Sequence, residues 1–202
     1  MNQKERMLAG LPYKAWLDGL AEEQLATKKK VYKYNLCEPW KVKKIERRIR
    51  GIIGKAGSNI NIIAPFHCDY GAHIEVGDNF VANYNCVILD VAKVTIGDNV
   101  MFGPNVSILT AGHPVHPESR NSRYEYGIEI TIGDNVWIGG NTVVNPGVHI
   151  GNNTVIGSGS VVTKDIPDNV IAVGNPCKVL RPISEQDRSY YHKEKIFDVN
   201  DY

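Results

Sequence analysis

Aliphatic residues recur at every sixth position along the C-terminal half of this 202-residue chain. The longest unbroken run of the pattern comprises Ile132, Ile138, Val144, Ile150, Ile156 and Val162. A period of six fits neither the 3.6-residue stripe of an amphipathic helix nor the two-residue alternation of a half-buried strand. It predicts a parallel β-solenoid, in which three six-residue units make one triangular coil and the aliphatic side chains stack along the axis.

Small or polar residues follow these aliphatic positions, where the chain has to turn. They are Gly133, Gly139, Asn145, Gly151 and Gly157. Glycine and Asx residues suit such corners, because they tolerate a positive φ or bond their own backbone. The same register occurs earlier, in residues 76–88 and 96–107, and its phase slips by two residues between Ile88 and Ile96.

The first 58 residues have the sequence pattern of helices. In Lys41–Ile53, the apolar residues Val42, Ile45, Ile49 and Ile52 fall at helical spacing, with basic residues on the other face, which predicts an amphipathic helix. Pro39 suits its first turn, and a second helix is predicted over Leu20–Tyr34. We therefore divide the chain into a helical domain (1–58), a β-helix domain (59–183) and a C-terminal tail (184–202) with no assigned structure.

The repeat is interrupted between Leu109 and Ile130. Residues 110–118 read Thr-Ala-Gly-His-Pro-Val-His-Pro-Glu, with glycine and proline punctuation and no six-residue register. A loop of this length that interrupts a compact scaffold is usually functional. We therefore expect the extended loop 110–130 to carry the chemistry.

Composition narrows the range of partners. The 23 basic and 22 acidic side chains give a net charge of +1, whereas a nucleic-acid-binding protein usually shows a basic excess. No apolar run approaches the ~20 residues that span a bilayer, and the polar start Met1–Arg6 has no apolar signal-peptide core. The four cysteines form no C-x-x-C pair, which predicts free thiols in the cytoplasm rather than a zinc site.

Several segments together resemble one known family. They are 7–13 (Met-Leu-Ala-Gly-Leu-Pro-Tyr), 68–71, 79–85, 110–114 (Thr-Ala-Gly-His-Pro), 161–167 and 174–179. With the repeat, they resemble the maltose and galactoside O-acetyltransferases, a branch of the left-handed β-helix acyltransferases, over about residues 5–183. The resemblance implies a mainly β, left-handed parallel β-helix with a small N-terminal helical domain. It also implies a homotrimer with sites between subunits, acetyl-CoA as co-substrate and no metal.

The resemblance implies acetyl transfer to a sugar hydroxyl, with His113 as the general base. An imidazole with an unperturbed pKa of ~6.5 suits that task. The resemblance further implies acceptor contacts at Asp69, Asn83 and Asp90. Its implied coenzyme A contacts are Gly140, Ser158, Thr163, Lys164, Lys178 and Arg181. Cations near a phosphate form charge-assisted bonds, although Lys178 stands where arginine is more usual and would offer a point charge.

Each of these positions also has a structural interpretation. Asx residues such as Asp69 and Asn83 populate coil corners in any case, and Lys164 fits a solvated turn. The segment 89–91 (Leu-Asp-Val) has the maltose-like form, and near Ala15 no acidic residue aligns with the acidic contact of the galactoside type. The preferred sugar therefore stays open.

Three other functions are compatible with a β-helix. One is a hexapeptide acetyltransferase for an antibiotic, serine or another small hydroxyl compound. A second is a metal-dependent hydratase of the γ carbonic anhydrase type, which needs three histidines, two of them at H-x4-H spacing, whereas His113 and His116 are three apart. The third is a non-catalytic binding solenoid. Metal content, thiol release from acetyl-CoA and binding without turnover distinguish them.

Overall fold

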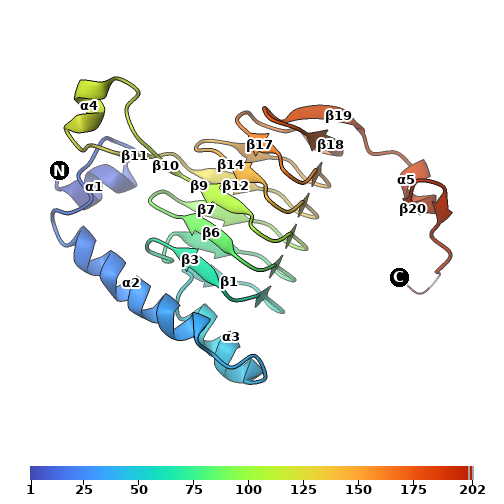
Figure 1. Cartoon of the computed structure of the whole chain (residues 1–202), viewed down its shortest axis with the longest axis horizontal. Helices are drawn as coiled ribbons and strands as arrows, with labels where there is room; N and C mark the ends of the chain where they lie inside the picture. The colour runs from blue at the N-terminus through green and yellow to red at the C-terminus, as the bar shows by residue number, and fades with distance from the viewer. Residues whose placement is uncertain (200, 202) are drawn as a thin grey trace.

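The chain folds into a parallel β-solenoid with helices against its N-terminal side (Figure 1). This computed structural model describes residues 1–199 and 201, so Asn200 and Tyr202 of the predicted tail lie outside the described residues. The helices that precede the solenoid are α1 (Gln3–Leu8), α2 (Leu20–Asn35) and α3 (Val42–Arg50). The predicted solenoid and N-terminal helical region are both confirmed.

Successive strands belong to three sheets in rotation, and the sheets form the faces of a triangular prism. Face 1 contains β1 (Lys55–Ala56), β4 (Ile74–Val76), β7 (Val94–Ile96), β12 (Ile130–Ile132) and β15 (His149–Ile150). Face 2 contains β2 (Asn61–Ile62), β5 (Val81–Ala82), β8 (Met101–Phe102), β13 (Trp137–Ile138), β16 (Val155–Ile156), β18 (Val170–Val173) and β19 (Lys178–Pro182). Face 3 contains β3 (Phe66–Cys68), β6 (Cys86–Leu89), β9 (Ser107–Leu109), β14 (Val143–Val144) and β17 (Val161–Val162). We call the corners between them the 1–2, 2–3 and 3–1 edges.

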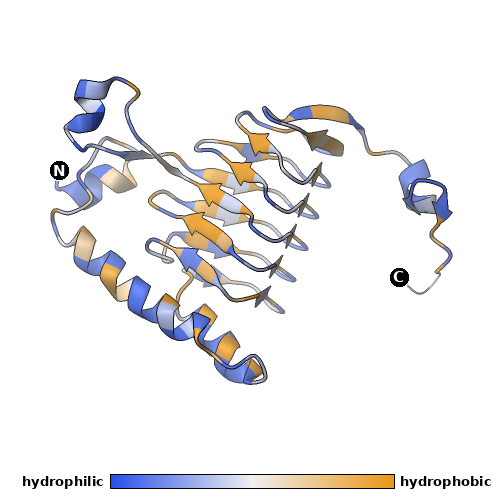
Figure 2. Ribbon diagram, in the orientation of Figure 1, coloured by the Kyte–Doolittle hydropathy of each residue, from blue (hydrophilic) through white to orange (hydrophobic). Residues whose placement is uncertain are grey.

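The six-residue pattern becomes the core of the prism. Parallel pairing aligns Ile132 with Ile96 below it and Ile150 above it, and Ile138 likewise lies between Phe102 and Ile156. These side chains are at most 2% exposed, and hydrophobic residues recur in the strands of successive coils (Figure 2). Since full burial of one such side chain is worth roughly 1.5–3 kcal/mol, the repeat supplies the main driving force for this fold.

The 1–2 edge carries a ladder of Asx side chains. Its asparagines all have positive φ, between 52° and 59°, and each side-chain amide donates to the next at 2.9–3.2 Å; they are Asn59, Asn79, Asn99, Asn135, Asn153 and Asn169. Beside them, the backbone N–H of Asp78 donates to the carboxylate of Asp98 at 2.6 Å. A Cβ on Gly77 would lie 2.2 Å from that carboxylate. The Gly-Asp-Asn triplets of the sequence are therefore explained by this edge.

Local details differ from the sequence-based expectations. We had predicted that Pro39 lies in the first turn of α3. That prediction is wrong, because the residue that caps α3 at its N-terminus is Lys41 and Pro39 therefore precedes the helix. Helix α1 was not predicted, although Asn2 and Glu5 form a reciprocal capping box, a signal that the sequence does contain. The phase slip before Ile96 corresponds to a wider corner at the 3–1 edge, in residues 90–93.

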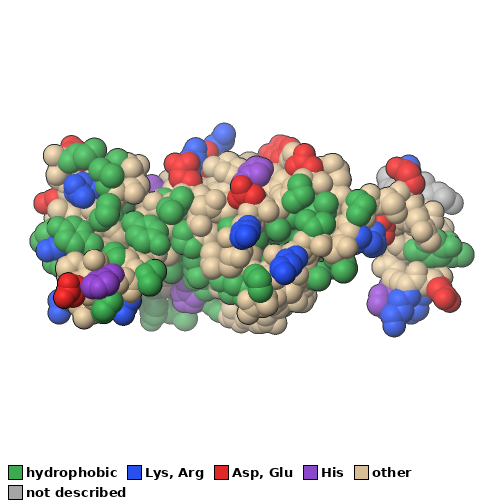
Figure 3. All heavy atoms as spheres, turned by 90° about the horizontal axis from the view of Figure 1, so that it is seen from above, with side chains coloured by type: hydrophobic (Ala, Val, Ile, Leu, Met, Phe, Trp, Pro, Cys, Tyr) green, Lys and Arg blue, Asp and Glu red, His purple; other side chains and the backbone are tan. Residues whose placement is uncertain are grey.

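The C-terminal segment continues past the last complete coil. Strand β19 pairs antiparallel with β18, and α5 (Gln186–Ser189) then leads into a hairpin of β20 (Tyr190–His192) and β21 (Lys195–Ile196). This hairpin stands away from the solenoid in both views (Figures 1 and 3). Between it and face 2 lies an open groove of about 870 Å³.

Other sequence-level features can be compared with the described residues. All four cysteines are free thiols, and three of them are buried. Within the described part of the chain, no helix is both long and apolar enough to cross a membrane. Among the same residues, no cluster of three or more His, Cys, Asp or Glu side chains is arranged to hold a metal ion.

Candidate active site

The interrupting loop leaves the solenoid at the 3–1 edge as an antiparallel hairpin. Its limbs are β10 (Ala111–Gly112) and β11 (Tyr126–Gly127), and α4 (Pro117–Asn121) lies toward its tip. His113 follows β10 directly, and its side chain is exposed. The ring of Tyr126 covers Gly112 so closely that a Cβ there would lie 2.5 Å from the ring. The hairpin therefore presents an accessible imidazole at the end of a paired strand.

Asp90 lies at the same edge and is completely buried. Its carboxylate accepts backbone N–H groups of Asp69 at 3.0 Å, Tyr70 at 2.9 Å and His73 at 3.4 Å. Burial raises the pKa of Asp90 to about 6, against the lowering effect of these bonds. In this chain Asp90 orients the segment around Asp69, and a direct contact with a sugar would require this edge to open.

Asp69 is more accessible than Asp90. It is half-buried and lines a groove of about 390 Å³ between α2 and face 3. Burial raises the pKa of its carboxyl, the Lys28 ammonium opposes that rise, and the negative charge of Glu125 adds to it. A carboxylate so placed can accept hydrogen bonds from the hydroxyls of a polyol.

The predicted site residues fall on two different edges of the prism. His113, Asp69 and Asp90 lie at the 3–1 edge, where Thr163 and Lys164 also follow β17. A second group, Asn83, Gly140 and Ser158, lies along the 2–3 edge, where Gly140 accepts the N–H of Gly159 one coil away at 2.9 Å. Face 3 separates the two groups. A single chain does not bring them together.

The remaining predicted coenzyme A contacts lie on β19. Lys178 and Arg181 are both exposed. The guanidinium of Arg181 makes a two-pronged ion pair with Asp187, at 2.6 and 2.7 Å, which lowers the pKa of Asp187 and raises that of Arg181. A phosphate that binds Arg181 would have to share it with Asp187 or displace the carboxylate.

The outward side chains differ among the three faces. On face 1 they are mainly polar: Lys55, Glu75, Thr95, Thr131 and His149. On face 2 they are mainly apolar: Asn61, Val81, Met101, Trp137, Val155 and Ile171. On face 3 an apolar set again predominates: His67, Val87, Leu89, Ser107, Leu109, Val143 and Val161. Trp137 and Met101 remain about half exposed, at 51% and 52%. The sequence analysis did not single out Trp137 as an exposed apolar residue of face 2. Its position directly before the core residue Ile138 is the signal that it points outward.

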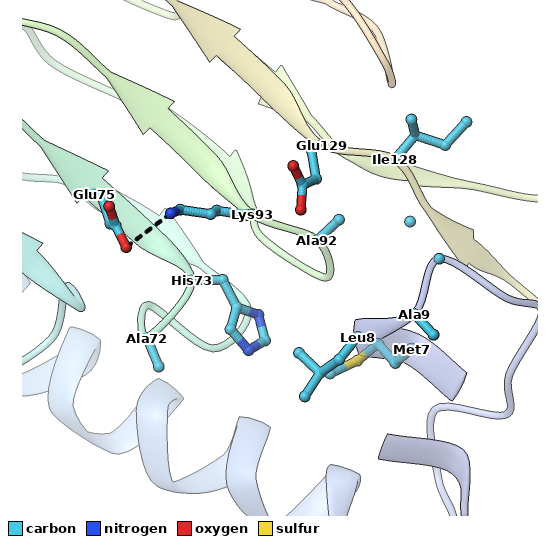
Figure 4. Close-up of a pocket in the computed structure, with 12 residues that line it drawn as sticks. Met7, Leu8, Ala9, Ala72, His73, Glu75, Ala92, Lys93, Ile128 and Glu129 are labelled. Carbon is cyan, nitrogen blue, oxygen red and sulfur yellow. Dashed lines mark ion pairs between the residues drawn. The ribbon is translucent and has the colours of Figure 1, made fainter. Parts of the chain in front are cut away.

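A separate pocket of about 580 Å³ lies where α1 meets face 1 (Figure 4). Met7 and Leu8 form part of its apolar wall, and Glu75 pairs with Lys93 at 3.1 Å on the opposite side. None of the predicted site residues lines it. His73 borders this pocket and contacts the Asp90 carbonyl through Nδ1 at 2.6 Å. This contact places the pocket next to the turn that contains Asp90.

Comparison with known proteins gives consistent results. Residues 129–164 match the bacterial transferase hexapeptide (six repeats), and residues 6–57 match the maltose acetyltransferase hexapeptide capping motif. The chain is 46% identical to the galactoside O-acetyltransferase of Escherichia coli K12 over 194 residues, which is 96% of either chain. The structure of a maltose O-acetyltransferase from Clostridium difficile superposes with a TM-score of 0.90 at 50% identity, covering 92% of this chain and 99% of that one. A galactoside acetyltransferase in complex with coenzyme A gives a TM-score of 0.96 at 45% identity, covering 98% and 100%.

Proposed function

The chain belongs to the maltose and galactoside O-acetyltransferase family, and from this premise we propose that it transfers the acetyl group of acetyl-CoA to a sugar hydroxyl with His113 as general base. The observation that carries the proposal is the exposed imidazole at the end of β10, in the loop that interrupts the solenoid. Asp69 lies at the same edge, in a groove open to solvent.

The reaction is a direct transfer. The acceptor oxygen attacks the thioester carbon while the imidazole of His113 removes its proton, so that the imidazole becomes imidazolium. The tetrahedral intermediate then collapses, the carbon–sulfur bond breaks, and the leaving thiolate takes up the proton to give free coenzyme A. The products are the sugar acetate and a thiol, and no acetylated enzyme forms. A positioned base is typically worth ~10²–10⁴ in rate.

The coenzyme A contacts belong to the same proposal. Thr163, Lys164, Lys178 and Arg181 are exposed polar or cationic side chains near the C-terminal end of the solenoid. Gly140 and Ser158 occupy neighbouring coils, where a small side chain leaves room for an extended ligand. Lys178 and Arg181 would hold phosphate groups.

A homotrimer accounts for two observations together. The predicted site residues are divided between two edges, and outward apolar side chains cover faces 2 and 3 but not face 1. A contact of face 2 on face 3 of the next copy is heterologous, and it forms a ring when the rotation between copies closes. In such a ring, both edges that carry predicted site residues border an interface, because the 3–1 edge bounds face 3 and the 2–3 edge bounds both contacting faces. We propose three subunits because the family resemblance implies a homotrimer.

The first test measures thiol release from acetyl-CoA with a panel of sugars, non-sugar hydroxyl compounds and no acceptor. We expect one or more sugars to drive release, and His113→Ala to lower kcat by ~10²–10⁴ without changing the melting temperature, since the side chain is exposed. If the variant is as active as the wild type, His113 is not the base. If only non-sugar hydroxyl compounds drive thiol release, the acceptor is one of those compounds and not a sugar.

The proposed trimer is tested by introducing one lysine on an apolar face and, separately, one on the polar face. We expect Val143→Lys, on face 3, to lower the mass measured by sedimentation from trimer to monomer. The matched control Thr131→Lys, on polar face 1, should remain trimeric. A wild type that sediments as a monomer contradicts the trimer, whereas equal behaviour of the two variants contradicts the choice of faces.

A further inference from the structure

The opening element of the chain, residues 7–13, packs against the return limb of the catalytic loop. Tyr13 and Glu125 form a reciprocal antiparallel bridge: the N–H of Tyr13 donates to the carbonyl of Glu125 at 2.9 Å, and the N–H of Glu125 donates back at 3.0 Å. Although 112 residues separate the two in sequence, the Tyr13 segment therefore lies beside the start of β11 like an extra strand.

The side chains reinforce this bridge. The Tyr13 hydroxyl donates to the Glu125 carboxylate at 2.5 Å, a short distance typical of an O–H bond to a charged acceptor. Tyr13 has no exposed surface. Burial, and secondarily the bond to Glu125, raise its pKa, so the hydroxyl keeps its proton as a donor at physiological pH. Removal of the carboxylate would leave the buried hydroxyl without its acceptor, which is unfavourable.

The bridge is connected to His113 through only a few contacts. Glu125 directly precedes β11, which pairs with β10 through Gly112 and Tyr126. The Tyr126 ring lies across Gly112, and His113 is the next residue. At the base of the hairpin, the N–H of Ile128 donates to the carbonyl of Thr110 at 3.0 Å. Both limbs are thus fixed on the solenoid side of the imidazole.

The opening element is itself anchored. Met7, Leu20, Tyr70 and Val91 form a small buried cluster with Tyr13, separate from the solenoid core. Ala111 of the outgoing limb packs against the same cluster. The cluster therefore links the opening element to the outgoing limb and, through Val91, to the turn that contains Asp90.

We propose that Tyr13 and Glu125 are positioning residues for the transfer reaction, which form a clamp that holds the catalytic hairpin, and with it His113, at the acceptor site. This inference rests on the proposed function. Among the described residues, no hydrogen bond or ion pair joins either of them to His113, and we assign them an effect through β11 and β10, whose register continues to place Glu125 opposite His113. The clamp gives the 7–13 element a catalytic purpose besides capping the solenoid.

The test is a double-mutant cycle read as kcat and KM. Tyr13→Phe keeps the ring and removes only the hydroxyl, and we expect it to lower kcat by roughly 10- to 100-fold, since a displacement of about 1 Å in a reacting group has that effect. The KM for acetyl-CoA should stay within about twofold, because ground-state binding is retained. Glu125→Gln keeps an acceptor oxygen and should lose less. The double variant should be no slower than Tyr13→Phe, because the two residues act as a unit.

The matched control is Tyr124→Phe. Tyr124 lies in the same loop, and among the described residues no hydrogen bond to its hydroxyl is seen, so kcat should be unchanged. Additive losses in the double variant would overturn the clamp. So would a rise in the acceptor KM confined to Glu125→Gln, which would make Glu125 an acceptor contact.

His113→Ala, measured alongside, separates the two proposals. If it abolishes transfer while Tyr13→Phe keeps full kcat, the clamp fails and the base assignment stands. If the wild type acetylates no hydroxyl, the proposed function fails and amide hydrogen exchange decides the clamp. Faster exchange at residues 110–113 in Tyr13→Phe than in Tyr124→Phe supports it, and equal rates overturn it.

Discussion

Two edges of the prism use the same residue types in opposite ways. Along the 1–2 edge, exposed aspartates such as Asp78 and Asp98 each accept one backbone N–H from the coil below, and the arrangement repeats from coil to coil. At the 3–1 edge, the buried Asp90 accepts three backbone N–H groups, more than any other carboxylate in the described part of the chain. The repeating edge distributes stability over many similar bonds, whereas the irregular edge concentrates it in single residues next to the catalytic loop.

The largest difference between the edges should follow removal of one carboxylate from each. Asp90→Ala leaves one buried and two partly buried N–H groups without an acceptor, and at about 1–3 kcal/mol for a fully buried group we expect a total loss of about 3 kcal/mol. Acetyl transfer should also fall, because Asp69 loses its support. Asp98→Ala should lose much less, since water reaches its edge, and should keep full activity. Urea denaturation and thiol release measure both variants; equal losses would show that the two edges are alike.

A smaller effect is expected within the ladder itself. Asn99 has φ of +55°, which costs most L-residues about 1–2 kcal/mol, so Asn99→Ala should lose about that much in addition to its two ladder bonds. Asn99→Gly should lose only the bonds, because glycine adopts this φ freely. The gap between the two denaturation midpoints therefore isolates the backbone contribution. If alanine and glycine are equally destabilising, the ladder bonds and not the turn conformation explain these asparagines.

A third difference between the edges is expected in the pH dependence of stability. The folded-state pKa of Asp90 is raised to about 6, above an unfolded value of about 3.9. Its contribution to stability is therefore complete below pH ~4 and is lost as the pH rises through about 6. For Asp78, the bond from Ser58 lowers the pKa, and the contribution is lost as the pH falls. Thermal melting from pH 4.5 to 7.5 should show the wild type losing its advantage over Asp90→Asn, whereas Asp78→Asn should show no such loss. A gap for Asp90→Asn that grows with pH would reverse the assignment.

The regular part of the fold could be predicted because each aliphatic position makes the same contact in every coil. Ile132, Ile138 and Val144 lie on three different faces, yet each stacks on its counterpart one coil away. A period of six therefore specifies strand, corner and core together. Polar Gly-Asp-Asn triplets carry the same information for the 1–2 edge.

The irregular part could not be predicted from the residues alone. The pairing of Tyr13 with Glu125 joins segments 112 residues apart, and a single glutamate in a loop without register gives no periodic signal. Asp90 was recognised by its position, but its burial and three N–H bonds follow from a corner whose shape no repeat dictates. The predicted site residues are likewise divided between two edges because they lie at different corners of the coils, and the sequence pattern alone does not show which corner each one occupies.

The constant spacing of the coils has a last consequence, which is metric. Neighbouring parallel strands lie about 4.8 Å apart, and β9, which leads into the catalytic loop, is two pairings from β17, which leads to Thr163 and Lys164. The solenoid thus fixes distances along its axis in multiples of the strand spacing, and the ends of β9 and β17 lie about 10 Å apart along that axis. Insertion or deletion of one whole coil between these two strands would change their separation by one strand spacing, about 4.8 Å, without disturbing the core. A scaffold of this kind can adjust the reach between two chemical groups only in whole steps, which ties the length of its ligand to a count of repeats.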